Sequence, residues 1–353
     1  MFTTAATLSA PRSDSNPYPS FLRKQGLKKL KIMPKHIKPV PALHRRDALR
    51  LLLREQPDEF RENNVKHFSH LFENQSLQPD WLLGLYPDVD AESLEAVMLY
   101  QILPGNTAVV WVPTSPLEES TDQRHELFAE VMQRLEKNGV KFAQSAPDHL
   151  PVGFRDDLLN IGFFHLANLL YLVVLRDQFP FKTSEEFKTS RLRLVPFSPE
   201  RELELQNIVE ESYDGTLDCP EISGVLTTEE VLVGYRAQGD YRPERWFFAT
   251  TEDASEPVGV LLMSFYTETN TAELTYMGIC PSARGAGLGA DIAELAIEVA
   301  ASWNADQLVV AVDARNDPAV RAYQRSGFNG WMQREVYVKT IAPKSSATPP
   351  PCH

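Results

Sequence analysis

One stretch of the sequence combines residue types that could bind a phosphorylated ligand and move a proton. It runs from Glu273 to Ala290 and places an acid ahead of Arg284 and a run of alternating glycines. Apolar, β-prone residues predict a strand over 272–279, and apolar residues at helical spacing predict a helix that includes 292–303. The first backbone N–H groups of a helix have no partner inside it, and together with the helix dipole they attract anions. The residues therefore predict a pyrophosphate-binding loop.

Two kinds of protein use such a loop. Taken as Gly285, Gly287 and Ala290, it fits the Gly-x-Gly-x-x-Ala fingerprint of dinucleotide-binding folds, with Asp313 as the acid for the ribose. Four residues lie between Cys280 and the first glycine, however, whereas the dinucleotide turn leaves its strand almost at once. The residues that follow Asp313 are also too few to form the remaining parallel strands of a dinucleotide-binding fold. A loop whose glycines only turn the chain is a further alternative.

Taken instead as Arg284-x-x-Gly287-x-Gly289, the loop resembles the acyl-CoA signature of the GNAT acetyltransferase superfamily. A second block, from Asn316-Asp-Pro to Ser-Gly-Phe328, is similar to the last sequence block of that family. There the asparagine commonly contacts the pantetheine arm, and a helix tyrosine, here Tyr323, lies near the CoA sulfur. The resemblance covers about residues 191–341 and implies acetyl-CoA as co-substrate and no metal. The cofactor-binding residues that it implies are Met277, Gly278, Ile279, Arg284, Gly285, Ala286, Gly287, Leu288, Gly289, Ala290, Asn316 and Tyr323.

The resemblance also implies direct transfer of an acetyl group to a primary amine. An alkylammonium has a pKa near 10, so only about one in a thousand is a free nucleophile at neutral pH. The protein must therefore accept a proton, and Glu273, at the start of the glycine-loop strand, is the candidate general base. Tyr323 is the candidate acid for the leaving thiolate, and the backbone of 277–279 would polarise the thioester carbonyl. The alternatives are a solvated glutamate and a tyrosine that only packs. Cys280 is interpreted as a small buried residue rather than a nucleophile.

The acceptor is expected to meet the loop and helices between Tyr213 and Gln238. We expect a small-molecule or peptide amine and leave the oligomeric state open. The competing hypothesis is a non-catalytic acyl-CoA sensor or interaction protein, which would need neither Glu273 nor Tyr323. The substrate-binding candidates are Tyr213, Asp218, Glu221 and Tyr235, with Asp214 beside them.

Apolar patterns and turn residues predict the elements that must hold these residues. In the first half we expect helices over 45–55, 65–72, 122–137 and 154–160. Strands are expected there over 96–103, 107–112, 140–146 and 169–175, with Pro104-Gly105-Asn106 as a hairpin turn. In the second half we expect strands over 192–197, 246–251, 258–266, 272–279 and 308–312. Helices are expected after Pro199, over 228–238, after the glycine loop and over 319–326.

The order of these elements repeats. Hairpin, long helix, strand, short helix, Gly-Phe and final strand occur twice, with Asn160–Phe163 matching Arg325–Phe328. A repeat of this length indicates tandem domains. We predict an α/β (α+β) fold of two tandem GNAT-like domains, each with a mixed, mostly antiparallel central sheet flanked by helices. The layout also resembles that of the mycothiol synthases, from which we carry over no substrate. The predicted ranges are a disordered basic tail 1–33, a degenerate domain 34–178, a linker 179–190, a catalytic domain 191–341 and a disordered tail 342–353.

The first copy has lost the chemistry of the second. Its segment 113–122 has no glycine, and Glu118, Glu119 and Asp122 would stabilise the helix dipole themselves and repel a pyrophosphate. Leu158 stands where the second copy has Tyr323. The first domain is interpreted as a scaffold that packs on the second and shapes the acceptor pocket. Weak CoA binding there remains open.

Composition sets the outer limits. The chain of 353 residues is long enough for two domains, and 43% hydrophobic with 24% charged residues is typical of globular proteins. The net charge of −13 argues against nucleic acid, although residues 1–54 carry twelve basic side chains and two acids. That segment is a tail of open role, or the chain starts at Met33. Three scattered cysteines and the lack of a long apolar run lead us to expect a cytoplasmic protein without a membrane segment.

Overall fold

The computed structural model describes residues 36–88, 90, 93–114, 121–146, 154–180, 186–251 and 256–341. The predicted tails 1–33 and 342–353, and the acids Glu118 and Glu119, lie outside these residues, as does the side chain of Asp122. Among the described residues, no helix is both long and apolar enough to cross a membrane.

Helices and strands follow the predicted order, with boundaries that differ by a few residues. Two short strands at the start of the sheet, β1 and β2, were not expected from the sequence. The helices are α1 Arg45–Leu52, α2 Asp58–Glu73, α3 Thr121–Lys137, α4 Phe154–Asn160, α5 Glu202–Tyr213, α6 Thr228–Arg236, α7 Leu288–Ser302 and α8 Asp317–Arg325. The strands are β1 His36–Pro39, β2 Leu82–Tyr86, β3 Ala96–Leu103, β4 Thr107–Thr114, β5 Phe142–Ser145, β6 Phe164–Leu175, β7 Arg193–Pro196, β8 Trp246–Thr250, β9 Gly259–Tyr266, β10 Thr271–Ile279, β11 Gln307–Asp313 and β12 Asn329–Thr340.

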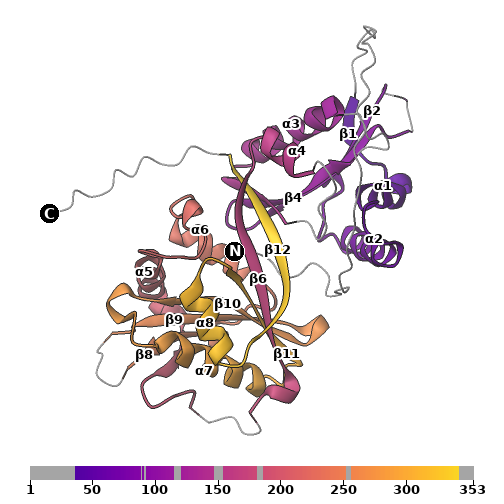
Figure 1. Ribbon diagram of the computed structural model, residues 1–353. Helices are drawn as coiled ribbons and strands as arrows, with labels where there is room; N and C mark the ends of the chain where they lie inside the picture. The colour runs from indigo at the N-terminus through magenta and orange to yellow at the C-terminus, as the bar shows by residue number, and fades with distance from the viewer. Residues whose placement is uncertain are drawn as a thin grey trace, which may run out of the picture.

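All strands in the described residues belong to one 12-stranded sheet, in the order β1-β2-β3-β4-β5-β12-β6-β11-β10-β9-β8-β7. The pairs β4/β5 and β10/β11 are parallel and the other pairs are antiparallel. Figure 1 shows the two halves of the chain at opposite ends of the long strands β6 and β12. The predicted fold class, two similar α/β halves with mixed sheets, is therefore confirmed.

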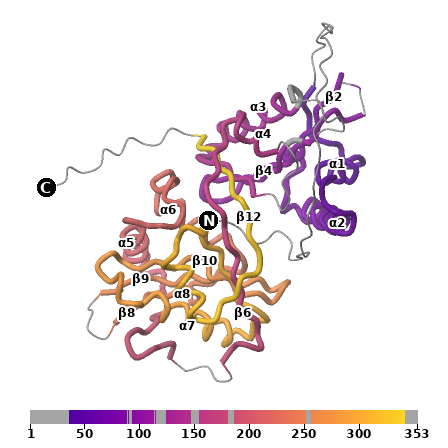
Figure 2. Tube along the Cα trace, viewed as in Figure 1, coloured from indigo at the N-terminus to yellow at the C-terminus, as the bar shows by residue number. Residues whose placement is uncertain are grey.

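The last strands of the two halves are exchanged, which the sequence did not predict. β12, the last strand of the second half, pairs with β5 of the first half, while β6 of the first half pairs with β11 of the second. The two strands also pair with each other and run side by side in Figure 2. The residues that follow β12 and β6 make equivalent main-chain hydrogen bonds to the other half. Ile341 N–H donates to Lys141 O at 2.8 Å, and Arg176 N–H donates to Asp306 O at 2.9 Å. The predicted domain limits stay a prediction, and strand pairing crosses them.

Matching hydrogen bonds support the repeat residue by residue. At the end of α4, Phe163 N–H donates to Leu158 O at 2.9 Å, and at the end of α8, Phe328 N–H donates to Tyr323 O at 3.0 Å. A glycine at positive φ precedes each phenylalanine, Gly162 at 87° and Gly327 at 98°. Such a C-terminal cap requires the left-handed conformation that glycine adopts without strain. Leu158 thus occupies the position of Tyr323 and is fully buried.

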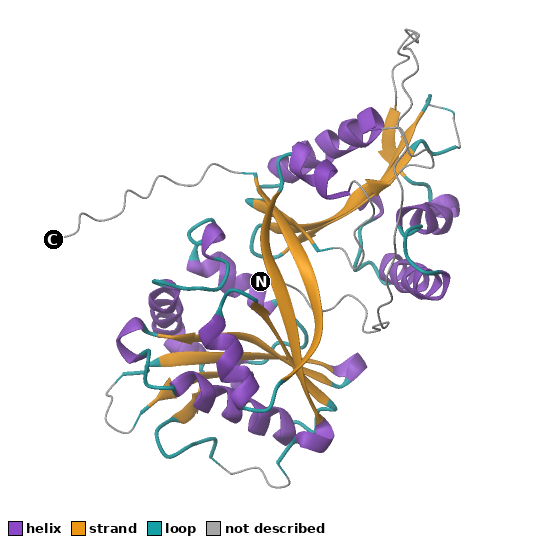
Figure 3. Ribbon diagram, in the orientation of Figure 1, coloured by secondary structure: helices purple, strands orange, loops and turns teal. Residues whose placement is uncertain are grey.

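Helices cover both faces of each half of the sheet (Figure 3). In the first half, residues of α1 and α2 form one apolar cluster with the sheet, and residues of α3 and α4 form another. In the second half, α7 and α8 belong to one apolar cluster, while α5 and α6 belong to a separate one. The cofactor loop and the acceptor helices therefore lie on different layers, with β10 between them.

Candidate functional site

β10 and β11 separate in the middle of the second half. Their parallel pairing runs from Thr271 with Gln307 to Leu274 with Val310 and then ends. β11 continues beside β6, whereas β10 shifts register beyond Leu274 and continues along β9 to Ile279. No described strand pairs with the β11 side of 275–278. Main-chain N–H and C=O groups on this edge must find other partners, and an extended amide-containing ligand can supply them.

The glycine loop ends directly at the first turn of α7. Gly285 and Gly287 both have φ of 80°, and Gly287 is the N-cap residue of the helix. A glycine has no side chain to accept hydrogen bonds from the first-turn N–H groups, so it leaves them to an outside acceptor. At Gly289 an added Cβ would lie 3.7 Å from Ala322 and from Ile279, which shows how closely α7 approaches α8 and β10. This geometry supports the predicted anion-binding role of the loop.

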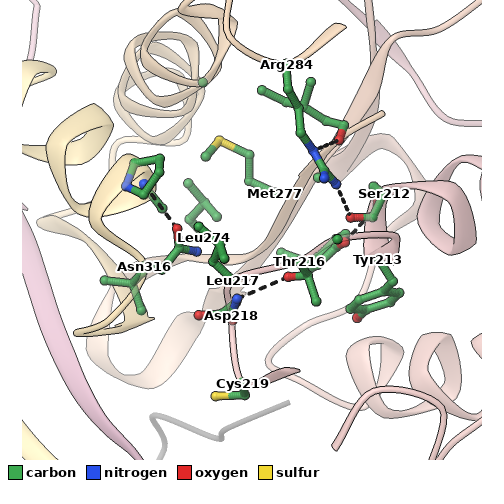
Figure 4. Close-up of a pocket in the computed structure, with 18 of the residues that line it drawn as sticks. Ser212, Tyr213, Thr216, Leu217, Asp218, Cys219, Leu274, Met277, Arg284 and Asn316 are labelled. Atoms are coloured by element: carbon green, nitrogen blue, oxygen red, sulfur yellow. Dashed lines mark hydrogen bonds between the residues drawn. The ribbon is translucent and has the colours of Figure 1, made fainter. Parts of the chain in front are cut away.

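Arg284 binds main-chain oxygens on the acceptor side of the site. Its guanidinium donates to the main-chain oxygens of Ile279 at 3.0 Å, Asp214 at 2.6 Å and Ser212 at 2.9 Å. Figure 4 shows this side chain reaching from the loop to the end of α5. The arginine therefore joins the cofactor loop to the acceptor side of the site, and its contact with the cofactor stays a prediction.

Other arginines supply positive charge around the loop. Arg191 donates to Ala286 O at 2.6 Å and forms an ion pair with Asp291 at 2.8 Å. Arg321 and Arg325 lie four residues apart on α8 and line the cavity beside the loop. Sequence analysis did not select any of these arginines. The spacing of Arg321 and Arg325, four residues apart, could have indicated that they share one face of α8.

A cavity of about 1280 Å³ connects the glycine loop with the separated strands and α5, α6 and α8. Ligand pockets usually have volumes of about 300–1,000 Å³, so this cavity can hold a long cofactor and a second molecule. It brings together the predicted acid, base and loop; Ala286 and Glu221 are not among its lining residues. The predicted residues that do line it are Tyr213, Asp218, Tyr235, Glu273, Met277, Gly278, Ile279, Arg284, Gly285, Gly287, Leu288, Gly289, Ala290, Asn316 and Tyr323.

Glu273 is buried in β10 just before the strands separate, with 3% of its surface exposed. The hydroxyl of Tyr266, on the neighbouring β9, donates to Glu273 Oε2 at 2.6 Å. A hydrogen bond to a carboxylate is short and strong, and it fixes the orientation of the acceptor. The structure thus excludes a merely solvated glutamate, while its role as base remains a prediction.

Tyr323 and Asn316 approach the cavity from the opposite side. Burial, with the nearby Asp218 carboxylate, raises the pKa of Tyr323, so its hydroxyl stays protonated. Its ring packs edge-on against Phe328 with a centroid distance of 5.3 Å. Asn316 is the N-cap of α8 and accepts from Ala319 N–H at 3.3 Å through Oδ1. Its amide nitrogen is therefore the group that it can offer to a ligand.

Three tyrosines form the wall on the α5 and α6 side. The hydroxyls of Tyr213 and Tyr235 are 2.8 Å apart, and the ring of Tyr276 stacks on Tyr235 at a centroid distance of 5.5 Å. Tyr276 in turn shares a hydrogen bond of 2.8 Å with Ser212. Burial raises the pKa of each of the three. Sequence analysis missed Tyr276, because only the register of β10 shows that it faces the same wall.

The two candidate acids of the acceptor loop differ in position and in partners. Asp218 lines the cavity, accepts from Asp313 N–H at 3.0 Å, and the surrounding protein raises the pKa of its carboxyl. Glu221 is instead paired with Arg315 at 2.5 Å, and this arginine also binds Asp313. Glu221 is not among the residues that line the cavity and its carboxylate is held by Arg315, so the structure gives no support to the expectation that it binds the acceptor. Asp313, fully buried in the same network, cannot serve as a ribose acid.

Cys280 follows β10 and is buried, with 3% of its surface exposed. Burial raises the pKa of its thiol to about 11. A thiol that stays protonated at neutral pH is a poor nucleophile. This supports its interpretation as a small buried residue.

The sequence and the fold are similar to those of known acetyltransferases. The profile of the acetyltransferase (GNAT) family matches residues 209–328. Mycothiol acetyltransferase of Corynebacterium aurimucosum is 25% identical over 159 residues, 39% of this chain and 52% of that protein. Mycothiol acetyltransferase of Streptomyces griseus is 31% identical over 93 residues, 25% of this chain and 30% of that protein. The chain thus spans about half the length of the first relative and less than a third of the second.

A solved structure matches across both halves. The crystal structure of a GCN5-related N-acetyltransferase from Sphaerobacter thermophilus aligns with 88% of this chain and 96% of its own, with a TM-score of 0.58 and 15% identity. At this identity the likeness concerns the fold. The separated strands and the glycine loop at the start of α7 lie within residues 209–328, the segment that matches the profile of the acetyltransferase (GNAT) family.

Proposed function

We propose that the protein is an N-acyltransferase that transfers an acetyl group from acetyl-CoA to a primary amine. The observation that carries this proposal is the single cavity in which the start of α7, the unpaired edge of β10, Glu273 and Tyr323 meet. An acyl transferase needs an anion site, a carbonyl site, a base and an acid within one space. The described residues offer a candidate for each.

The cofactor side fits coenzyme A by the chemistry of its donors. First-turn N–H groups of α7 and the left-handed glycines before them suit a pyrophosphate. The edge of β10 over 275–278 suits the amides of a pantetheine arm, with Asn316 facing it from α8. Arg321 and Arg325 add positive charge beside the loop. Bound there, acetyl-CoA supplies an activated acyl group.

The proposed chemistry uses two proton carriers. Glu273, oriented by Tyr266, takes a proton from the ammonium, directly or through water, and the amine nitrogen then bonds to the acyl carbon. Main-chain N–H groups of 277–279 stabilise the negative charge on the carbonyl oxygen. When the carbon–sulfur bond breaks, the hydroxyl of Tyr323 donates its proton to the departing sulfur, and the second proton that the nitrogen loses on becoming an amide returns to the tyrosine oxygen, directly or through water. The raised pKa of Tyr323 keeps that proton available at neutral pH.

The charges that line the cavity indicate which amines fit. Acids gather on the acceptor side, where Glu210, Asp214, Asp218 and Glu229 accompany Glu273, whereas Arg321 and Arg325 lie beside the cofactor loop. Aromatic and aliphatic side chains separate these groups. We therefore propose a cationic acceptor with an aromatic or apolar body and no acidic group. The relatives are named for mycothiol, and we carry over no substrate from them to this chain.

The test measures thiol release from acetyl-CoA with tyramine, spermidine, glucosamine and lysine, and acetyl-CoA binding by calorimetry. We expect binding, and turnover that is fastest with tyramine because it combines a cation with an aromatic body. Binding without turnover of any amine would support the sensor hypothesis. The absence of heat with both acetyl-CoA and CoA would refute the proposed function altogether.

A further inference from the structure

The hairpin turn between β3 and β4 of the first half rests directly on the main chain of α6. Gly105, in this turn, has φ of 82°, and a Cβ built on it would lie 2.3 Å from Glu230 O and 3.1 Å from Gly234 N. Conformation and space therefore both require glycine at this position. The turn is packed against helix backbone more closely than any side chain would allow.

Glu230 of α6 receives polar contacts from the same turn and from the start of β5. Asn106 Nδ2 donates to its carboxylate at 2.7 Å, and Lys141 Nζ bridges both oxygens at 2.7 and 2.6 Å. Although burial acts against it, these hydrogen bonds and one from Thr227 N–H lower the pKa of Glu230, which stays charged. We call Gly105, Asn106, Lys141 and Glu230 the α6 clamp.

The clamped helix carries part of the acceptor wall. Glu230 is the third residue of α6 and forms a capping box with Thr227, so the contact with Lys141 holds the helix at its first turn. The adjacent Val231 lines the cavity, as does Tyr235 one turn further on. Tyr235 supports the wall through its hydroxyl contact with Tyr213. A displacement of α6 would therefore move the acceptor wall directly, whereas the first turn of α7 packs against α8 and β10 rather than against α6.

The repeat shows that the clamp is a specialisation of the first half. Lys141 N–H donates to Asn106 O at 2.8 Å, and in the second half Asp306 N–H donates to Asn270 O at 2.8 Å. The matching residues are thus Lys141 and Asp306, a base and an acid. Asp306 pairs with Arg176 at the surface rather than with a helix of the acceptor wall. The lysine is not required by the repeated fold, and its partner is Glu230.

We propose that Lys141, Asn106 and Gly105 are positioning residues of the first half that set acceptor affinity by fixing α6. The first half thereby contributes to the selectivity of a site whose catalytic groups lie in the second. This inference rests on the proposed transferase function, and it extends that function to a lysine that lies 89 positions before its partner on α6.

The experiment compares Lys141→Met with Lys339→Met in the full chain. Both variants remove a partly buried ammonium that contacts the first half, but Lys339, in β12, bonds Ile161 O and packs on Phe128. For Lys141→Met we expect the KM for the fastest amine of the panel to rise about tenfold, the value for one lost charge-assisted hydrogen bond. The KM for acetyl-CoA should stay within about twofold, and Lys339→Met should leave both constants near those of the parent.

A double-mutant cycle identifies the partner. Glu230→Gln keeps an acceptor for the capping box but removes the charge, so we expect an intermediate increase in the amine KM. Lys141→Met combined with Glu230→Gln should be no worse than Lys141→Met alone, because both changes break the same contact. Additive effects, or an equal rise in both KM values in Lys141→Met and Lys339→Met, would overturn the proposal.

Hydrogen exchange gives an answer that does not depend on turnover. We expect the amides of 231–236 to exchange faster in Lys141→Met than in Lys339→Met, with those of α7 unchanged. Equal exchange of α6 in the two variants would refute the clamp even if the transferase is active. If the parent protein acetylates no panel amine but 231–236 still exchange faster in Lys141→Met than in Lys339→Met, the clamp is supported while the transferase function fails.

Discussion

At the scale of single residues, the pair of Tyr266 and Glu273 is the most informative feature of the site. An acid in the interior of a strand needs a partner, and the tyrosine hydroxyl at 2.6 Å is one. Its position on β9, one strand away, could not be predicted from the local pattern around Glu273. Glu273 was therefore identified from its place in a family motif. Tyr266, which orients it, could be identified only from the pairing of β9 with β10.

We predict that Glu273→Gln lowers kcat/KM for the amine about 100-fold, because a general base contributes at least that much. Tyr266→Phe should cost about tenfold, since the base remains but loses its orientation. Acetyl-CoA affinity, measured by calorimetry, should be unchanged in both variants. An unaltered rate in Glu273→Gln would remove the residue from the mechanism.

The titration of Tyr323 gives a second prediction. Burial raises its pKa above the ordinary value near 10, so the hydroxyl is protonated throughout the neutral and mildly alkaline range. We expect kcat to show no decline from loss of this proton below about pH 10, and Tyr323→Phe to lower kcat about 100-fold at every pH in that range. Above about pH 10 the unfolded chain ionises first, so the protein should also lose stability.

The check is a pH–rate profile of both proteins together with thermal unfolding in the same buffers. A decline in kcat between pH 8 and 9 that is absent from Tyr323→Phe would contradict the raised pKa. It would equally show that the tyrosine is the titrating group.

At the scale of secondary structure, the loop before α7 was predictable, since glycine spacing and helix periodicity are local signals. The role of Arg284 was not, because its carbonyl partner at Ser212 lies 72 positions away. For the same reason the sequence placed Glu221 in the acceptor site, whereas its partner Arg315 follows 94 positions later. β1 and β2 were missed because one is short and partly polar and the other lacks alternation.

We predict that Gly287→Ala weakens CoA binding, since φ of 80° is strained for alanine by about 1–2 kcal/mol and the N-cap must shift to relieve it. Gly139→Ala is the matched control, because its φ is 74° and nothing lies within 4 Å of the added Cβ. Both variants should melt at similarly lowered temperatures, but only the first should lose affinity in CoA calorimetry. Equal CoA affinity in the two would show that the loop does not hold the ligand.

At the scale of the whole molecule, the exchange of β6 and β12 joins two halves that the repeat pattern presents as separate. Their sequences are similar enough in pattern that either strand could follow either Gly-Phe turn and pair with either β5 or β11. Apolar alternation specifies that a strand forms, and it does not specify which of two equivalent neighbours it chooses. The repeat and the fold class could be predicted from the sequence, and the pairing could not.

We predict that fragments 1–180 and 186–353 are each unstable alone and co-purify as a one-to-one complex when produced together. Each fragment lacks the strand that continues its own sheet, and an unpaired edge favours aggregation. Size-exclusion chromatography and calorimetry of the single and combined fragments provide the test. Two soluble fragments with independent melting transitions would contradict a fold held together by the exchange.

The exchange also determines when the protein can finish folding during synthesis. The sheet of the first half is incomplete until β12 is made, and β12 is translated after every other described strand. A nascent chain arrested anywhere before residue 329 carries β5 without its neighbour, exposed to other chains for as long as translation of the second half continues. Slow codons or premature stops late in the message should therefore impair folding first in the half that was translated earlier, because that half lacks β12.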